Sequence, residues 1–187
     1  MKIRATFAGA VLFSFSLFAQ ANLINFDEPG ITNPVDNFYA ADGVIFQTGD
    51  WIVGNGFGQT SQPNFAFSSS GTGYMNIIGG FTNSLDFTYG AFVDSTVNIF
   101  DGLNGTGSIL GSISLPGGNQ NSFTFVSLGF SGTALSAAIV SAQNQFGWDD
   151  VQFSKGQKDI PIAATLPLLG LGLAALGYNR RKQKRYS

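Results

Sequence analysis

Residues 97–113 read VNIFDGLNGTGSILGSI, a sequence in which two alternating apolar and polar runs flank a segment rich in Gly, Asn and Asp. Alternation with a period of two places the apolar side chains on one face of a strand, and Gly, Asn and Asp tolerate the positive φ angles of tight turns. The pattern predicts a β-hairpin. It is not a phosphate-binding loop, because it lacks a lysine and joins two strands instead of opening a helix.

The same kind of pattern continues on both sides of the hairpin. Between residues 22 and 153 no long segment has helical periodicity, and Gly, Asn, Ser and Thr interrupt short apolar runs about every ten residues. We therefore predict an all-β domain built as a two-sheet sandwich. Its strands are expected at 23–27, 43–46, 50–53, 64–67, 74–78, 84–89, 96–101, 108–115, 122–128, 133–140 and 146–153.

Charge is segregated along the chain. All nine basic residues lie near the two ends, and the stretch 22–154 holds ten carboxylates without a lysine or arginine. Such a domain cannot neutralise phosphates, so nucleic acid is not an expected partner, whereas a divalent cation is. A surface that is acidic only to remain soluble is the alternative.

The chain contains neither cysteine nor histidine. This excludes disulfides, thiolate and imidazole metal sites, a cysteine nucleophile and a Ser-His-Asp triad. A glycosidase would need two facing carboxylates with one of them held protonated, and nothing in the sequence marks such a pair. We predict a protein that is not an enzyme, and a secreted glycan hydrolase is the least favoured alternative.

The N-terminus predicts a secretory signal peptide over residues 1–21. Lys2 and Arg4 form a positive start, residues 5–19 are apolar, and Ala19 and Ala21 form a small-x-small cleavage site. Cleavage after Ala21 leaves an ectodomain over residues 22–154. An uncleaved anchor is the alternative, but the apolar run is short for a hydrocarbon core of about 30 Å.

The C-terminus predicts one membrane span after a linker at 155–159. Residues 160–178 carry no charge, and at about 1.5 Å per residue they suit a single transmembrane helix. The basic residues that follow should stay cytoplasmic, so the ectodomain faces outward from the inner membrane. This basic stop comprises Arg180, Arg181, Lys182, Lys184 and Arg185.

A short proline motif, a Gly- and Leu-rich apolar helix and a basic end together resemble the PEP-CTERM sorting signal, here over residues 160–187. The family motif reads Val-Pro-Glu-Pro-Ala, and the corresponding positions are Ile160, Pro161, Ile162, Ala163 and Ala164. The first proline matches, whereas the glutamate and the second proline are missing. A plain C-terminal tail anchor is the alternative.

The resemblance implies a Gram-negative bacterium that produces exopolysaccharide. It also implies export by the secretion machinery, anchoring in the inner membrane and cleavage by an exosortase-like enzyme. The processed protein is then expected at the cell surface or in the extracellular matrix.

The middle domain also resembles exported jelly-roll domains of this group, which are similar in outline to carbohydrate-binding modules. The resemblance rests on the hairpin and on residues 24–28 and 148–153. It implies a jelly-roll-like sandwich whose first and last strands are neighbours, with a structural calcium ion near their junction. The matching oxygen ligands are Asp27, Glu28, Asp149 and Asp150. Aspartates that only cap turns are the alternative.

Aromatic residues are numerous, with 19 Phe, 5 Tyr and 2 Trp, and most should fill the core. Phe65 and Phe67 share one strand face and are expected to be buried. Four aromatic residues beside Gly- or Asn-rich loops are expected to reach solvent and to stack on a sugar, namely Trp51, Tyr39, Phe57 and Tyr74.

Our leading interpretation is a non-enzymatic, exported cell-surface or matrix protein whose domain contacts exopolysaccharide. A calcium-dependent carbohydrate-binding module is the alternative.

Overall fold

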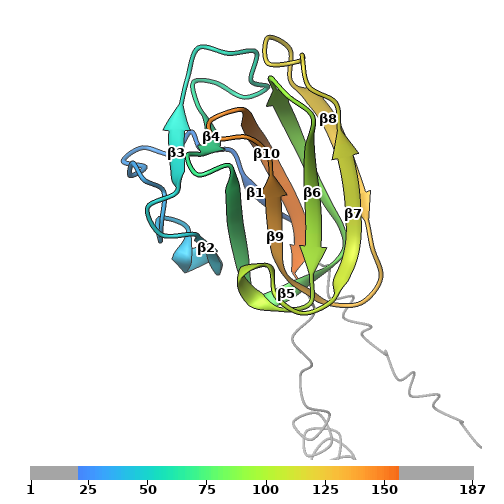
Figure 1. Cartoon of the computed structure of the whole chain (residues 1–187). Coiled ribbons are helices and arrows are strands. Elements are labelled where there is room, and N and C mark those ends of the chain that lie inside the picture. The colour runs from blue at the N-terminus through green and yellow to red at the C-terminus, as the bar shows by residue number, and fades with distance from the viewer. Residues whose placement is uncertain (1–20, 156–187) are drawn as a thin grey trace, which may run out of the picture. The chain divides into compact units, whose positions relative to one another are not determined.

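The computed structural model describes residues 21–155 (Figure 1). This part contains no α-helix, and its two short 3₁₀ turns are η1 (Ala40–Asp42) and η2 (Leu103–Gly105). None of its helical turns is long and apolar enough to cross a membrane. The predicted signal peptide (except Ala21), most of the linker and the C-terminal sorting signal lie outside the described residues. The ten strands are β1 (Ala21–Ile24), β2 (Val44–Phe46), β3 (Trp51–Gly54), β4 (Phe65–Ser68), β5 (Thr72–Ala91), β6 (Ser95–Phe100), β7 (Ile109–Leu115), β8 (Thr124–Gly129), β9 (Ala134–Val140) and β10 (Phe146–Lys155).

Strand β5 takes part in both layers of an antiparallel sandwich (Figure 1). Its first part pairs with β2 and β9, and β9 continues the layer through β6 to β7. Its second part pairs with β8 and β10, and β10 continues the other layer through β4 to β3. The predicted all-β sandwich is confirmed.

The predicted break between the strands 74–78 and 84–89 is wrong. The segments 74–78 and 84–89 were expected to be separate strands, but both belong to β5. Gly79 and Gly80 between them have φ angles of +87° and +78°. These left-handed conformations redirect the chain from one layer to the other, where a turn between two strands was expected.

Two predicted strand pairings are confirmed. The hairpin consists of β6 and β7, which pair from Ser95 with Leu115 to Phe100 with Ile109 and are joined through η2. The first and last strands are neighbours, since β1 pairs with the second half of β10.

The core lies between the layers and is largely aromatic. Trp51 of β3 and Trp148 of β10 stack at its centre with ring centroids 4.8 Å apart. Each fully buried large apolar side chain contributes roughly 1.5–3 kcal/mol to folding. The other large buried side chains include Phe26, Phe46, Phe81, Phe87, Met75, Ile77, Leu85, Ile99 and Ile139.

Candidate functional site

Two glycines on neighbouring strands form a flat floor on the outer face of one layer. Gly90 of β5 pairs with Gly147 of β10, and the next residue of β10, Trp148, points the opposite way into the core. A Cβ atom on Gly90 would lie 2.2 Å from the ring of Phe123, and one on Gly147 would lie 2.6 Å from the ring of Phe65. The two rings therefore rest directly on the backbone of the sheet.

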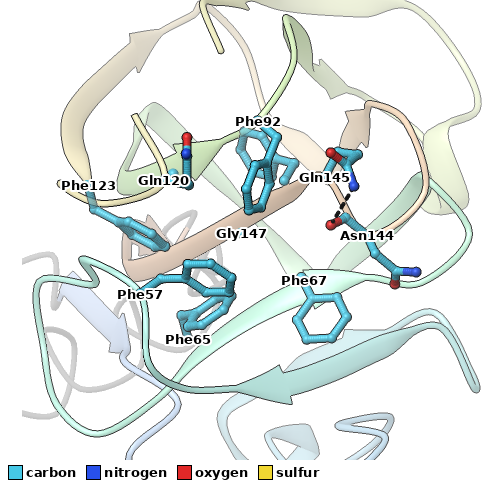
Figure 2. Close-up of a pocket in the computed structure, with 11 residues that line it drawn as sticks. Phe57, Phe65, Phe67, Phe92, Gln120, Phe123, Asn144, Gln145 and Gly147 are labelled. Atoms are coloured by element: carbon cyan, nitrogen blue, oxygen red, sulfur yellow. Dashed lines mark hydrogen bonds between the residues drawn. The ribbon is translucent and has the colours of Figure 1, made fainter. Parts of the chain in front are cut away.

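Above this floor lies a cleft of about 320 Å³ (Figure 2). Three amide side chains, those of Gln120, Asn144 and Gln145, contribute polar groups to its lining. The apolar part of the lining comes mainly from Phe57, Phe65, Phe67, Phe92 and Phe123.

The rings contact one another mostly edge to face. Phe57 lies 5.4 Å from Phe65 and 5.6 Å from Phe92 between ring centroids. Phe65 is only 4 % exposed, whereas Phe57 and Phe92 are 41 % and 44 % exposed. Phe57 and Phe92 thus present apolar surface to solvent, and the buried ring of Phe65 supports Phe57.

Two loops that line the cleft, those of Phe57 and Gln120, are tied together by their backbones. Gly58 donates to the carbonyl oxygen of Gln120 (3.1 Å), and the carbonyl oxygen of Gly58 accepts from the amide of Phe123 (2.8 Å). A Cβ atom on Gly58 would lie 2.1 Å from the carbonyl group of Asn121, so only glycine permits this approach.

Side chains also fasten both loops to the sheet. Asn119 accepts from the amide of Ala91 (2.8 Å) and donates to the carbonyl oxygen of Tyr89 (3.0 Å). In the loop that follows Phe57, the Thr60 hydroxyl donates to the Thr88 hydroxyl (2.7 Å). The walls of the cleft are thereby held in place by the fold itself.

The prediction that Trp51 and Tyr39 reach solvent is wrong. Trp51 is buried against Trp148, and its Nε1 donates to the carbonyl oxygen of Tyr74 (3.1 Å). Tyr39 is buried too, and its hydroxyl donates to the carboxylate of Glu28. A large aromatic ring beside a loop is drawn into the core when its polar atom finds a partner there.

The other two predicted ligand residues differ from each other. Phe57 is exposed and lines the cleft. Tyr74 is half-buried and does not line it, because its ring lies against the η2 turn near Gly105.

Several cleft residues escaped the sequence-based prediction. Phe65 is buried as expected, but it supports the cleft rather than the core between the layers. Phe92 and Phe123 carried no distinguishing pattern. The usable signal was Gly147 inside the predicted strand 146–153, since a glycine there often marks a close approach by another group. Gly90 follows directly after the predicted strand 84–89 and gave a weaker signal.

The predicted calcium ligands Asp27, Asp149 and Asp150 lie near an irregularity in β10. The pairing of β10 with β5 shifts register between Asp149 and Gln152, and Asp150 has a φ angle of +48°. Strand β4 pairs with β10 before this bulge, and β1 pairs with it afterwards.

Protein donors occupy these carboxylates. Asp149 is fully buried and accepts from the hydroxyl of Ser61 (2.9 and 3.0 Å) and from its backbone amide (3.0 Å). Asp27 accepts from the backbone amide of Asn64 (2.8 Å). Burial raises the pKa of Asp149 to about 6, and it also raises the pKa of Asp150.

Glu28 is not part of this arrangement, because it accepts from the Tyr39 hydroxyl. No group of three or more acidic side chains suited to a metal ion occurs within residues 21–155. Within the described residues, Asp149 and Asp27 hold the loop that carries Ser61 and Asn64.

No family model and no curated protein matches the chain. Among solved structures, a variant of a family 29 carbohydrate-binding module matches with a TM-score of 0.49 and 10 % identity, over 74 % of this chain and 94 % of that one. A cleaved adhesin domain of Lys-gingipain matches with a TM-score of 0.48 and 12 % identity, over 73 % of this chain and 98 % of that one. A family 6 carbohydrate-binding module from Clostridium stercorarium in complex with cellobiose matches with a TM-score of 0.45 and 15 % identity, over 63 % of this chain and 91 % of that one. Similarities at this level do not assign the chain to a family.

Proposed function

We propose that the chain is an exported, jelly-roll-like module that binds carbohydrate in the phenylalanine-lined cleft and does not cleave it. The observation that carries the proposal is the pair of exposed rings, Phe57 and Phe92, beside three amide side chains. The C–H faces of a sugar pack on aromatic rings, and its hydroxyls bond to amides, which both donate and accept.

The form of the cleft suits this role. Its volume of about 320 Å³ lies at the small end of the ~300–1,000 Å³ range of ligand sites, so it has room for one or two sugar rings. Backbone hydrogen bonds at Gly58 already join two of the loops that line it. A preformed site loses little conformational entropy when a ligand binds.

The carboxylates support binding without hydrolysis. Glycoside hydrolysis needs two carboxylates about 5–10 Å apart across the scissile bond. No acid is among the residues that line the cleft. Glu28 bonds to Tyr39, and Asp149 is buried against Ser61.

We also propose that the module is exported and sorted at its C-terminus by a PEP-CTERM-like signal. The support is the sequence at the two ends, which is the signal-peptide pattern of residues 1–21 and the motif, apolar run and basic stop of residues 160–187. Exopolysaccharide outside the cell is then the carbohydrate that the cleft would meet.

The test of carbohydrate binding removes the two exposed rings together, as Phe57→Ala with Phe92→Ala. The matched control is Phe125→Ala, since Phe125 is 65 % exposed on β8 and does not line the cleft. Retention is measured by affinity electrophoresis on a panel of soluble neutral and acidic polysaccharides, and folding is checked by circular dichroism.

The double variant should lose about tenfold or more in affinity, because each aromatic contact contributes roughly 0.5–1.5 kcal/mol. The Phe125→Ala control should bind like the unmodified protein. If the unmodified protein binds no polysaccharide, or the folded double variant binds as well as the control, the proposal is wrong.

A further inference from the structure

We infer that the cleft selects uncharged glycans and rejects acidic ones, an inference that rests on the proposed binding function. The starting observation is that no charged side chain is among the residues that line the cleft. Acidic glycans are usually held by Arg or Lys, which pair with carboxylates through charge-assisted hydrogen bonds. The cleft offers no such partner.

The only cation in the described part of the chain lies far from the cleft. Lys155 ends β10, whereas Phe146 begins this strand beside the cleft. At about 3.3 Å per residue, ten residues of strand separate the two ends by roughly 30 Å. This exceeds the Debye length of about 8 Å at physiological ionic strength, so Lys155 cannot attract an anion to the cleft.

Negative charge, in contrast, lies close to the cleft. Asp94 is exposed and stands two residues after Phe92, and its Oδ1 accepts from the amide of Gly117 (2.9 Å) in the loop that leads to Gln120. Nine other carboxylates lie between residues 22 and 154, where no lysine or arginine balances them. A glycan with a carboxylate on each repeat would meet repulsion from this field.

The polar groups of the cleft also favour hydroxyls over carboxylates. Gln120 Oε1 is shielded from solvent and has no hydrogen-bond partner within the described residues. An unsatisfied acceptor gains free energy when a ligand supplies a donor. A sugar hydroxyl can supply that donor once the amide group of Gln120 rotates toward the cleft. An ionised carboxylate cannot, because it has only acceptors.

The experiment compares two soluble polymers with one β-glucan backbone, neutral hydroxyethylcellulose and acidic carboxymethylcellulose. A second pair, arabinoxylan and glucuronoxylan, repeats the comparison on a different backbone. Affinities of the full chain in detergent are measured with EDTA present, so that divalent cations cannot bridge acids. Salt is varied from about 10 to about 150 mM, over which the Debye length falls from ~30 to ~8 Å.

The neutral polymers should bind with affinities that change less than about twofold with salt, because no ion pair contributes. At low salt the acidic polymers should bind at least about tenfold more weakly, and the gap should narrow as salt screens the repulsion. At low salt, Asp94→Asn should reduce the difference in affinity between the neutral and the acidic polymers. It should leave the affinity for the neutral polymers unchanged.

The matched control for Asp94→Asn is Asp101→Asn, which removes the same charge from the hairpin turn. Both residues accept a backbone amide through Oδ1, which asparagine retains. Equal or tighter binding of the acidic polymers at low salt, still dependent on Phe57 and Phe92, would overturn the selectivity and leave carbohydrate binding intact. Binding of no polymer, or binding that is independent of the two rings, would overturn both.

Discussion

Asp149 shows how a single buried carboxylate can serve the fold rather than a ligand. Burial removes it from water and raises its pKa to about 6, although hydrogen bonds from Ser61 and from the amide of Asp150 oppose this shift. The side chain fastens the loop around Ser61 to β10. Asp149 was predicted to be a calcium ligand, and in the fold its carboxylate accepts hydrogen bonds from Ser61 and from the amide of Asp150.

This pKa predicts a pH-dependent stability. The unfolded chain has the ordinary aspartate pKa of 3.8, so the folded protein binds this proton more tightly. Its contribution to stability is complete below pH 3.8 and is lost as the pH rises through about 6. The difference between the pKa of Asp149 in the folded and in the unfolded protein corresponds to about 3 kcal/mol in the free energy of unfolding.

Urea denaturation at about pH 4 and pH 7 gives the change in the free energy of unfolding between the two pH values. This change is compared between the unmodified protein and Asp149→Asn, whose side chain does not titrate. Asp42→Asn, at an exposed carboxylate, is the control. The loss of stability toward pH 7 should be smaller in Asp149→Asn by up to about 3 kcal/mol. An equal loss of stability in the unmodified protein and in Asp149→Asn would contradict this prediction. If millimolar calcium abolished the loss in the unmodified protein, Asp149 would be identified as a metal ligand instead.

At the level of elements, two strands carry the architecture. β5 spans both layers because Gly79 and Gly80 redirect it, and β10 bulges at Asp149 so that β4 and β1 share one of its edges. The strand positions were predictable because alternation is a local property. The continuity of β5 was not, since a Gly-Gly pair is equally typical of a turn.

A substitution at Gly147 of β10 tests whether the floor of the cleft requires glycine. In Gly147→Ala the new methyl group would meet Phe65 at 2.6 Å, so the ring or the strand must move. Overpacking of this kind costs typically about 1–3 kcal/mol, and it should also weaken binding of neutral glycan.

Gly129→Ala on β8 is the matched control, because the nearest atom to its Cβ is 3.9 Å away. Thermal denaturation and glycan affinity are measured for both variants. Gly147→Ala should lose stability and affinity together, and Gly129→Ala should lose neither. A Gly147→Ala protein as stable as the control would show that Phe65 does not need the bare backbone.

For the whole molecule, a polyanionic β-sandwich lies in the sequence between two cationic ends. The described residues place ten carboxylates on one β-sandwich, and every basic residue except Lys155 lies outside them. We expect the two ends to be removed during export and sorting. The mature protein would then keep the ten carboxylates of the β-sandwich and retain only two basic residues, Lys155 and Lys158.

Mass spectrometry of protein recovered from the cell surface or medium tests this expectation. The first residue should be Asn22, and the basic tail from Arg180 to Ser187 should be missing, because both predicted cleavages precede release. Protein extracted from the inner membrane of the same cells is the control and should retain the tail. Intact termini on surface protein would contradict the sorting proposal.

The sequence by itself determined the all-β class, the hairpin of β6 and β7, the absence of thiol and imidazole chemistry, and the uneven distribution of charge. These features follow from composition and from contacts between residues close in the chain. The sequence also determined that the core is largely aromatic, because alternation shows which residues share a strand face.

Only the tertiary structure decided which aromatic rings face solvent. Both faces of a strand such as β4 carry apolar residues, and the identity of the partner covering each face is a long-range property. Trp51 packs against Trp148 in the core, whereas Phe57 and Phe92 remain exposed to solvent. The cleft joins residues from position 57 to position 147, and no local pattern links positions so far apart.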